Sequence, residues 1–589
     1  MNQKLEDLLQ LALQTPEEVR ERTGNLNVGF DERERTWELI VKYHGSLEEL
    51  GGLGVQVEYL IAGYAILTVP QQLVERISQL EQIEYVEKPK RYFYEAELPY
   101  ENSCILPVTG GGQGLTGRNI LLAVLDSGCD YRLQEFRNSD GSTRIRYLWD
   151  QTLSPSEEEG RRPPAGFSLG VEFDSARINE ALEASGLRQY ELLPSLDVSG
   201  HGTAVAGIAA GNSQAYRGTA PEAELLIVKL GLPDAFSFPR TTEIMRAVTY
   251  AVRKAIELEM PLAINLSFGN TYGAHDGSSL LERFLDNAAE IGRTVICVGS
   301  GNEGASSGHL SGSLLNAYGA SAEVELAVAE YQSSLSIQLW KNYSDVYRIT
   351  LRSPGGREAE LPASIESGKY TLQMEQTEVL VFLGEPLPYS AAQEIYLELL
   401  PAGGGYVNSG VWVIRLEPVR VVTGQYYLYL PADTVRSPGT GFFRPTPELT
   451  LTIPSTAAKV ITVGAYDSTY DTYADFSGRG YADAERTIGV VTAGLTKPDL
   501  AAPGVGVLAP DIYGGYTPVT GTSFATPIVT GSAALLMEWG IVRGNDSFLY
   551  GEKVKAYLRK GAQPLRGESV YPNARVGWGK LCVEESLPE

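Results

Sequence analysis

The feature that most constrains the fold of this chain is a series of short apolar segments, between residues 117 and 304, that alternate with longer helical stretches. The short segments are apolar on both faces and end in turn residues; they read NILLAVLD, AELLIVKL, PLAINLSFG and RTVICVGSG. The last three are separated by TTEIMRAVTYAVRKAIELEM and SLLERFLDNAAEIG, which have the apolar period of helices. Strands buried on both faces and joined by helices predict an α/β fold, in which a parallel sheet carries helices on both faces.

The apolar period changes between residues 322 and 432. Apolar and polar residues alternate there in SLSIQLW, VYRITLR, YTLQM, EVLVFLG, EIYLELL, VWVIRLE and YYLYLP. Roughly eight short strands separated by turns predict an antiparallel sandwich or jelly roll. The α/β pattern resumes at AKVITVGAY, so the β segment is predicted to be inserted within the α/β domain.

A smaller α+β unit precedes these domains. TWELIVKY, AILTV and IEYVEK are predicted strands, and PQQLVERISQLEQ is a predicted helix with Leu73, Ile77 and Leu80 on one face. The first 25 residues predict an amphipathic helix rather than a secretory signal. The expected plan is an N-terminal unit over residues 1–100, an α/β domain in two parts over 101–304 and 451–589, and an inserted β domain over 305–450.

Charge and composition exclude several classes of partner. The formal net charge is −25, with 73 acidic residues against 48 Lys and Arg. This balance argues against nucleic acid and against an anionic membrane surface as partners. No apolar stretch approaches the length that a membrane-spanning segment requires, so we expect none. We also expect a cytoplasmic location.

The four cysteines, Cys104, Cys129, Cys297 and Cys582, are far apart and form no CxxC pair. This spacing predicts reduced, mostly buried thiols rather than a metal cluster or a disulfide framework. The acidic stretches SEEEG and YDSTYDTYAD lack the pattern of an EF-hand and are interpreted as solvated loops. No metal and no cofactor are expected.

Four polar residues lie at the predicted boundaries of these elements: Asp126 in DSG, His201 in HGTAVAG, Asn302 in GNEG, and Ser523 in GTSFATP. Alone, Ser523 fits a helix N-cap, and Asp126 and Asn302 fit ordinary turns. His201 differs, because small residues surround it instead of the bulky apolar residues of a core histidine. Together the four supply a nucleophile, a base, a group that orients the base, and a donor for an oxyanion.

In this order along the chain, the four motifs resemble those of the subtilisin-like serine proteases (subtilases, S8 family). The resemblance covers about residues 117–304 and 454–583 and includes TKPDLAAPG and PNARVGWGKLCVEES. It implies a serine endopeptidase that hydrolyses a protein or peptide substrate through an acyl-enzyme. Asp126, His201 and Ser523 would be catalytic, and Asn302 would stabilise the oxyanion.

Two segments at the ends of neighbouring predicted strands are expected to line the substrate cleft. Their residues are Asn265, Leu266, Ser267, Phe268 and Gly269 in the first segment and Gly299, Ser300 and Gly301 in the second.

Within this resemblance, the N-terminal unit looks like a subtilase propeptide, which would chaperone and inhibit the enzyme and be cleaved in cis between Tyr94 and Cys104. A propeptide without a signal sequence, and a β insert between Asn302 and Ser523, resemble the clostridial Csp germination proteases, which process the precursor of a spore-cortex hydrolase. The resemblance implies a spore-associated or cytoplasmic location, and the propeptide as a partner.

Two alternatives stay open at this point. The chain could be a catalytically silent scaffold with the subtilase fold, in spite of its intact triad. It could also bind glycans through the insert, using aromatic side chains such as Trp340 and Trp412, although alternating aromatics usually fill a sandwich core.

Overall fold

The computed structural model describes residues 4–15, 17, 29–31, 33–59, 63–88, 103–110, 113–158, 160–231, 239–315, 321–362, 364, 368–385, 390–480 and 496–588. The chain divides into two compact units, residues 1–95 and 96–589, each described by itself. The propeptide junction is expected between Tyr94 and Cys104. Within this range, residues 94–102 are not among those that the structure describes.

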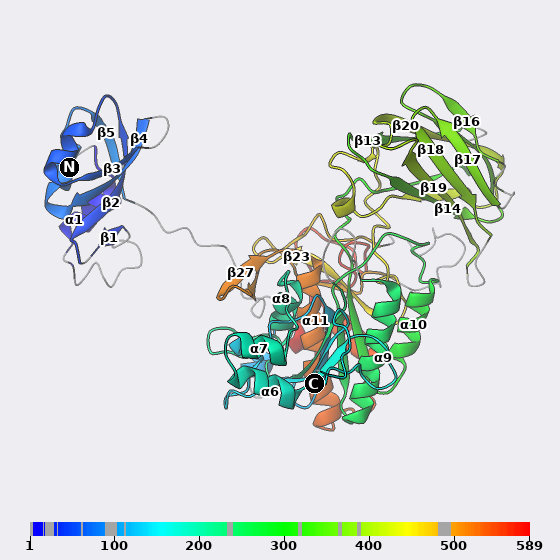
Figure 1. Cartoon of the computed structure of the whole chain (residues 1–589), viewed down its shortest axis with the longest axis horizontal. Coiled ribbons are helices and arrows are strands. Elements are labelled where there is room, and N and C mark those ends of the chain that lie inside the picture. The colour runs from blue at the N-terminus through cyan, green and yellow to red at the C-terminus, as the bar shows by residue number, and fades with distance from the viewer. Residues whose placement is uncertain are drawn as a thin grey trace. The chain divides into compact units, whose positions relative to one another are not determined.

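The N-terminal unit (blue in Figure 1) is a small sheet covered by short helices. Alternate residues of its central strand, including Trp37, Leu39 and Val41, are buried against the helical side, where Ile77 packs with them. The predicted strands and helix are present, but the helix is shorter than expected because the chain must turn at Leu80 to pair β5 with β2. The elements are α1 (Asp7–Gln14), β1 (Phe30–Asp31), β2 (Thr36–Tyr43), β3 (Gln56–Tyr59), β4 (Tyr64–Pro70), α3 (Val74–Ser78) and β5 (Ile83–Glu87), with strand order β1-β2-β4-β3 and β5 paired with β2.

A nine-stranded sheet forms the centre of the second unit, with strand order β24-β23-β11-β10-β6-β9-β7-β8 and β25 paired with β23. Its strands are parallel, as predicted, except for the antiparallel pairs that β8 and β24 make at its two edges. The strands are β6 (Leu121–Asp126), β7 (Ile145–Asp150), β8 (Val171–Asp174), β9 (Glu224–Lys229), β10 (Leu262–Leu266), β11 (Thr294–Gly299), β23 (Ile461–Asp467), β24 (Thr472–Tyr473) and β25 (Leu500–Pro503).

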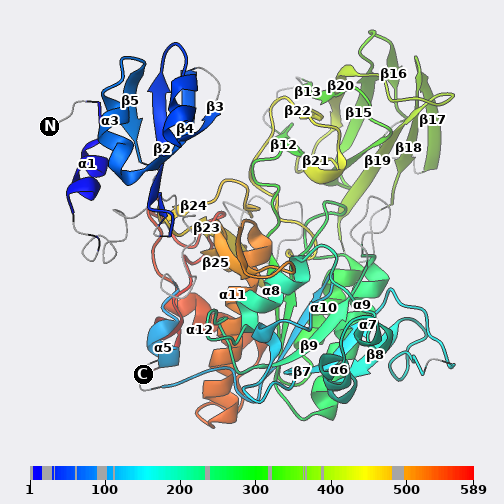
Figure 2. The same ribbon diagram turned by 60° about the vertical axis from the view of Figure 1, so that its left-hand side comes forward.

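Helices cover both faces of this sheet, which confirms the predicted α/β class. α8 and α11 contribute to one apolar core, whereas α9 and α10 contribute to the core on the other face (Figure 2). The helices are α5 (Leu106–Gly110), α6 (Ser175–Glu183), α7 (Leu187–Leu192), α8 (His201–Ala210), α9 (Thr241–Glu257), α10 (Leu280–Ala289), α11 (Thr522–Met537), α12 (Gly551–Gly561) and α13 (Val583–Ser586), and a hairpin of β26 (Val507–Pro510) and β27 (Tyr516–Val519) precedes α11.

The expectation that no apolar stretch approaches membrane-spanning length is wrong for one helical stretch. Among the described residues, Thr522–Val542, formed by α11 and the π-helical turn after it, is long and apolar enough to cross a bilayer by length and composition. However, 83% of its apolar window is buried inside the protein. Its composition is therefore that of a helix packed on all sides in the core.

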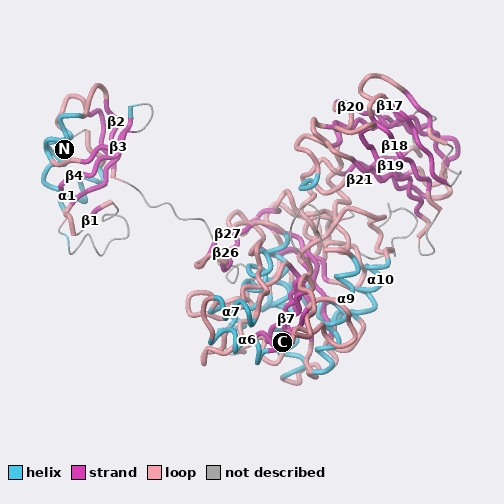
Figure 3. Tube along the Cα trace, in the orientation of Figure 1, coloured by secondary structure: helices cyan, strands magenta, loops and turns pink. Residues whose placement is uncertain are grey.

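The insert is an antiparallel two-sheet sandwich, as predicted (Figure 3). Its strands enclose an apolar core. Trp412 is fully buried in that core, and Trp340 is 4% exposed. Neither tryptophan is therefore available to stack on a sugar. One sheet has the order β12 (His309–Ser313), β21 (Gln425–Tyr429), β14 (Leu335–Asn342), β19 (Ala392–Pro401), β18 (Thr377–Leu383), β17 (Gly368–Met374); the other has β16 (Glu358–Glu360), β15 (Val346–Arg352), β20 (Gly410–Arg420), β13 (Ala322–Val328), β22 (Gly441–Phe442).

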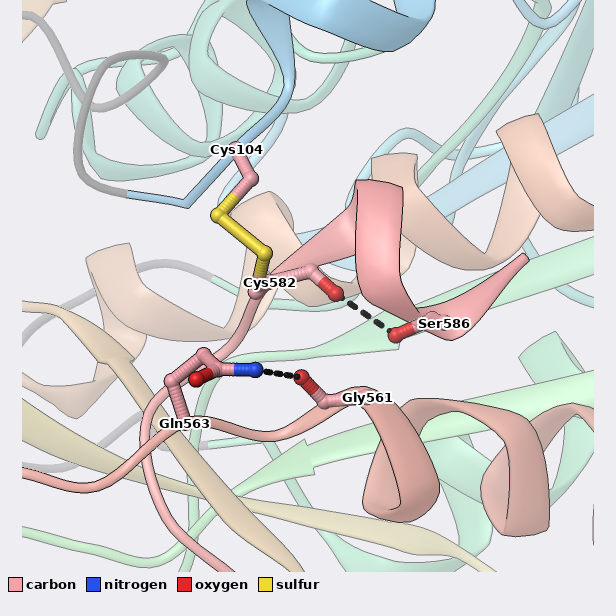
Figure 4. The surroundings of a disulfide bond; sticks show 5 residues. All are labelled: Cys104, Gly561, Gln563, Cys582 and Ser586. Atoms are coloured by element: carbon pink, nitrogen blue, oxygen red, sulfur yellow. Dashed lines mark hydrogen bonds between the residues drawn. A yellow bond between two sulfur atoms is a disulfide. The ribbon is translucent and has the colours of Figure 1, made fainter.

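A disulfide corrects the prediction of four reduced cysteines. Cys104 and Cys582, separated by 478 positions, are bonded to each other (Figure 4), whereas Cys129 and Cys297 are buried free thiols, as expected. A backbone hydrogen bond lies beside the disulfide, in which the Val583 amide donates to the Ser103 carbonyl at 2.9 Å. The sequence could not show this pair, because only folding brings its two ends together.

Replacing both Cys104 and Cys582 with Ser should lower the free energy of unfolding by about 2–4 kcal/mol, since the cross-link then no longer restricts the unfolded chain. Thermal unfolding of the variant and the parent measures the loss. As a check of the pairing, an alkylating reagent applied to the denatured, unreduced protein should modify two thiols, and four after reduction. Modification of four thiols without reductant would contradict the disulfide.

Candidate active site

Three of the four polar residues singled out in the sequence lie at the carboxyl edge of the sheet. Asp126 is the last residue of β6, His201 is the first residue of α8, and Ser523 is the second residue of α11. α8 and α11 lie side by side in both views (Figures 1 and 2). Their starts are neighbours, because the rings of His201 and Phe524 are 5.3 Å apart, although 322 positions separate His201 from Ser523 in the sequence. Ligand sites of α/β proteins form at this edge.

The small residues of α8 allow a very close approach to its neighbours. A Cβ atom placed on Gly202 would lie 2.2 Å from the Gly128 carbonyl oxygen, and one placed on Gly207 would lie 2.4 Å from the Pro510 ring. Because real Cβ atoms do not come this close, only glycine fits at either position. The small residues around His201 therefore hold it against the loop that follows Asp126.

His201 and Asp126 form a direct hydrogen bond. The imidazole Nδ1 and the carboxylate Oδ1 are 2.7 Å apart, and the same oxygen accepts the Ser127 amide at 2.7 Å. The side chain of Asp126 is 4% exposed and that of His201 is 33% exposed. Burial by itself lowers the pKa of His201, but the charge and hydrogen bond of Asp126, with the charge of Asp197, outweigh it, so the pKa is raised.

The carboxylate of Asp197 organises the backbone on both sides of His201. Its Oδ1 accepts from the Ser127 hydroxyl at 2.9 Å, the Ser199 hydroxyl at 3.1 Å and the Gly200 amide at 3.0 Å. Its Oδ2 accepts from the Thr203 amide at 2.9 Å and the Thr203 hydroxyl at 2.7 Å. One buried side chain thus connects the loop after Asp126 to the first turn of α8.

The sequence analysis did not select Asp197. The only signal for it is an acidic residue shortly before the expected helix start, where acceptors for free backbone amides are common. Two further bonds extend the same network, since the Gly202 amide donates to Ser127 at 2.9 Å and the His201 amide donates to Ser199 at 3.2 Å.

Ser523 is partly exposed, and its hydroxyl donates to the Ser267 carbonyl at 2.9 Å. In return, the Ser267 hydroxyl donates to the Ser523 carbonyl, also at 2.9 Å. The next residue, Phe524, packs on the imidazole of His201 with 5.3 Å between ring centroids. A rotation about Cα–Cβ changes the direction of the Ser523 hydroxyl without moving the backbone, and catalytic hydrogen bonds often form only when substrate is bound.

Asn302 is exposed and its amide is oriented by α11. The Oδ1 atom accepts from the amide and from the hydroxyl of Thr522, both at 3.0 Å. These bonds fix the oxygen and leave Nδ2 as a donor. The amide of Ser523, in the first turn of α11, has no acceptor within the helix, and the helix dipole is positive at this end. The Asn302 side chain and the Ser523 amide are thus both held at the first turn of α11.

The two predicted substrate segments only partly line the site. Gly269 is exposed, and Phe268 and Gly301 are partly exposed. The prediction that Asn265 and Leu266 line the cleft is wrong. Both belong to β10 and are fully buried. Asn265 accepts from the Thr530 hydroxyl at 2.9 Å and donates to the Ser267 hydroxyl at 2.8 Å. It therefore links α11 to the segment that contains Ser267.

Gly299 and Ser300 are buried as well, so their assignment to the cleft wall also needs correction. A Cβ atom on Gly299 would lie 3.0 Å from the Thr526 hydroxyl, which shows how closely β11 packs on α11. The Ser300 side chain instead faces Ser477, with 3.2 Å between the two hydroxyl oxygens.

Thr452 occupies the space between the exposed ends of the two segments, and nothing in the sequence analysis pointed to it. A Cβ atom on Gly269 would lie 2.4 Å from the Thr452 hydroxyl oxygen, and one on Gly301 would lie 2.4 Å from its methyl carbon. Thr452 is 5% exposed, and its hydroxyl has no hydrogen-bond partner among the described residues. It is a buried polar group that packs against both of these glycines.

No cluster of three or more His, Cys, Asp or Glu side chains suited to a metal ion occurs in the part of the chain that the structure describes.

Comparison with known proteins assigns both units. The family model described as Csp protease B prodomain matches residues 3–90, and the Subtilase family model matches residues 117–380 and 435–579. The solved structure of the Clostridium perfringens CspB protease is similar, with 32% identity, a TM-score of 0.74, and coverage of 83% of this chain and 96% of that chain.

Curated relatives match over shorter parts of their length. The serine protease AprX of Bacillus subtilis is 33% identical over 159 residues, which is 24% of this chain and 32% of AprX. The minor extracellular protease Vpr of the same organism is 23% identical over 509 residues, covering 80% of this chain and 52% of Vpr. The chain thus spans between a third and about half the length of these relatives.

Replacing Asp197 with Asn should lower the pKa of His201, because one of the negative charges that raise it is removed. The Asn amide would also present a donor to the Thr203 amide, which loosens the first turn of α8. Titration of the His201 ring signals by NMR measures the pKa shift.

The matched control is Asp174→Asn, since Asp174 is an N-cap that accepts from the Arg177 amide at the start of α6. The control should leave the His201 titration unchanged. An unshifted or raised pKa in Asp197→Asn would contradict the role given to this carboxylate.

Proposed function

Because the chain belongs to the subtilase family, we propose that it is a serine endopeptidase in which Asp126, His201 and Ser523 form the catalytic triad. The observation that carries the proposal is the 2.7 Å hydrogen bond between Asp126 and His201 beside the start of the helix that bears Ser523. A serine hydroxyl is a weak nucleophile unless a neighbouring base takes its proton, and this pair supplies that base.

In the proposed mechanism, the Ser523 hydroxyl turns from the Ser267 carbonyl toward Nε2 of His201. Its oxygen attacks the carbonyl carbon of the scissile peptide while His201 takes the proton. His201 then returns that proton to the leaving amine, which breaks the C–N bond and leaves an ester on Ser523. Water, deprotonated by the same imidazole, hydrolyses the ester, and Asp126 stabilises the imidazolium formed in each step.

The tetrahedral intermediates carry a negative charge on the former carbonyl oxygen. We assign its stabilisation to the side-chain amide of Asn302 and the backbone amide of Ser523. Both donors are fixed before the reaction begins, the first through Thr522 and the second through α11. Fixed donors aimed at developing charge are a large source of rate enhancement.

This mechanism has a defined pH dependence on its acidic side. His201 must be neutral to accept a proton, and its folded-state pKa is raised. Activity therefore rises with pH through that raised pKa, and loss of the charge of Asp197 would move the rise to lower pH.

The N-terminal unit is proposed to act as a propeptide that the enzyme cleaves from itself between Tyr94 and Cys104. The match to the Csp protease B prodomain supports this role. By the same likeness, we propose that the mature enzyme processes a protein precursor. The burial of Trp340 and Trp412 argues against glycan binding through these side chains.

Replacing Ser523 with Ala should abolish self-cleavage and peptide hydrolysis, because the nucleophile is lost while the fold is kept. The variant should run as the full-length chain on a denaturing gel and should not react with a fluorophosphonate probe. Ser547→Ala, at an exposed position beyond α11, is the matched control and should be processed like the parent. Unaided maturation of Ser523→Ala would contradict the assignment of Ser523 as the nucleophile, whereas a parent that does not react with the probe would favour a catalytically silent scaffold.

Replacing Thr452 with Ala should broaden the choice of residue before the scissile bond. The threonine closes the gap between Gly269 and Gly301, so its removal deepens that gap. We expect the ratio of kcat/KM for a peptide with Leu at this position to that with Ala to rise by about tenfold. Thr371→Ala, on an exposed part of the insert, should leave the ratio unchanged. An unchanged ratio in Thr452→Ala would show that this residue does not limit the pocket.

A further inference from the structure

A hollow of 1050 Å³ lies at the end of α8 opposite to His201. The loop after β6, the loop after α8 and Tyr516 of β27 form its walls. Three of its lining side chains, Arg132, Arg137 and Arg217, are positively charged, and only Glu135 is negatively charged. The hollow is therefore a basic site in a chain whose net charge is −25.

Two of these arginines form no ion pair with a carboxylate of the described residues. Arg132 donates to both carboxylate oxygens of Asp130, at 2.7 and 2.8 Å. Arg137 donates to the backbone carbonyl of Arg132, and its Nε is buried with no hydrogen-bond partner among the described residues. Within the described part of the chain, no carboxylate forms an ion pair with Arg137 or with the exposed Arg217.

One further arginine, Arg144, lies behind the wall, and the carboxylate whose charge acts on it and on Arg217 is Glu222, outside the lining of the hollow. Arg144 is 5% exposed behind the wall and donates to the Ala223 carbonyl at 2.8 Å and the Glu135 carbonyl at 2.7 Å. Burial lowers its pKa to about 10, so it stays charged at neutral pH. The carboxylate of Glu135 is itself buried and accepts the Tyr516 hydroxyl at 2.6 Å.

We propose that this hollow binds a ligand with two or more oxyanion groups, carboxylate or phosphate, which Arg137 and Arg217 contact directly. A guanidinium presents a planar fork of donors that matches both kinds of oxyanion. The volume is at the upper end of the range for small-molecule sites, which suits a ligand larger than a single ion.

The walls of the hollow are the loops that follow β6 and α8, together with β27, which precedes α11. β6, α8 and α11 carry Asp126, His201 and Ser523, respectively. The walls are tied together, because Ser213 and Tyr516 are within hydrogen-bond distance at 3.2 Å, and the rings of Tyr216 and Tyr516 stack with 5.1 Å between centroids. A ligand that binds only the folded walls must stabilise the protein by linkage.

The test is calorimetric titration of the full-length protein with citrate and with pyrophosphate in 150 mM salt (about physiological ionic strength). We expect saturable binding of at least one of them and a rise in melting temperature at saturation. Arg137→Gln with Arg217→Gln should weaken binding by about tenfold or more, as expected for the loss of charged hydrogen bonds. Arg188→Gln, which removes an exposed guanidinium from α7, is the matched control and should bind like the parent.

Arg217→Gln alone covers the case in which the double variant does not fold, because Arg217 is exposed. A parallel titration with hexaglutamate separates the two sources of the ligand. Binding of citrate or pyrophosphate that depends on these arginines supports a free small anion, and the same dependence with hexaglutamate alone supports an acidic protein segment. Equal binding by Arg217→Gln and the parent, or no binding of any probe by the parent, overturns the proposal.

Discussion

The hydrogen bond between Asp126 and His201 depends on how closely α8 can begin against the loop after β6. That approach is set by Gly202, whose missing side chain leaves room for the Gly128 carbonyl. The carboxylate of Asp197 then holds both sides of the contact by accepting from each of them. A larger residue at 202 would therefore separate the His201 imidazole from the Asp126 carboxylate.

α11 supplies the other half of the site from a single element. Its first turn carries Ser523, presents that residue's amide, and orients Asn302 through Thr522. The rest of the helix is buried, and at Gly531 a Cβ atom would lie 2.5 Å from Thr219. Its high hydropathy thus reflects contact with core residues on every side, which keeps the helix start rigid relative to the sheet.

The insert is joined to the segment that continues from Gly269. Thr271 donates to the Leu430 carbonyl at 2.8 Å, the Gly273 amide donates to Gln338 at 3.1 Å, and the His275 ring stacks on Tyr429 with 3.9 Å between centroids. These contacts connect the sandwich to the chain immediately beyond one wall of the site. The β domain therefore braces that wall, a role that its alternating sequence pattern did not indicate.

The sequence by itself determined the parallel sheet, the β insert and the choice of Asp126, His201, Asn302 and Ser523 as candidate site residues, because buried runs, strand alternation and short motifs are local properties. Tertiary structure alone decided that Asn265 points inward, that Asp197 joins two loops, that Thr452 fills a gap between glycines, and that Cys104 pairs with Cys582. Each of these depends on the distance between atoms far apart in the chain. Hydrophobic periodicity records whether a residue faces the core, but not which distant residue it meets there.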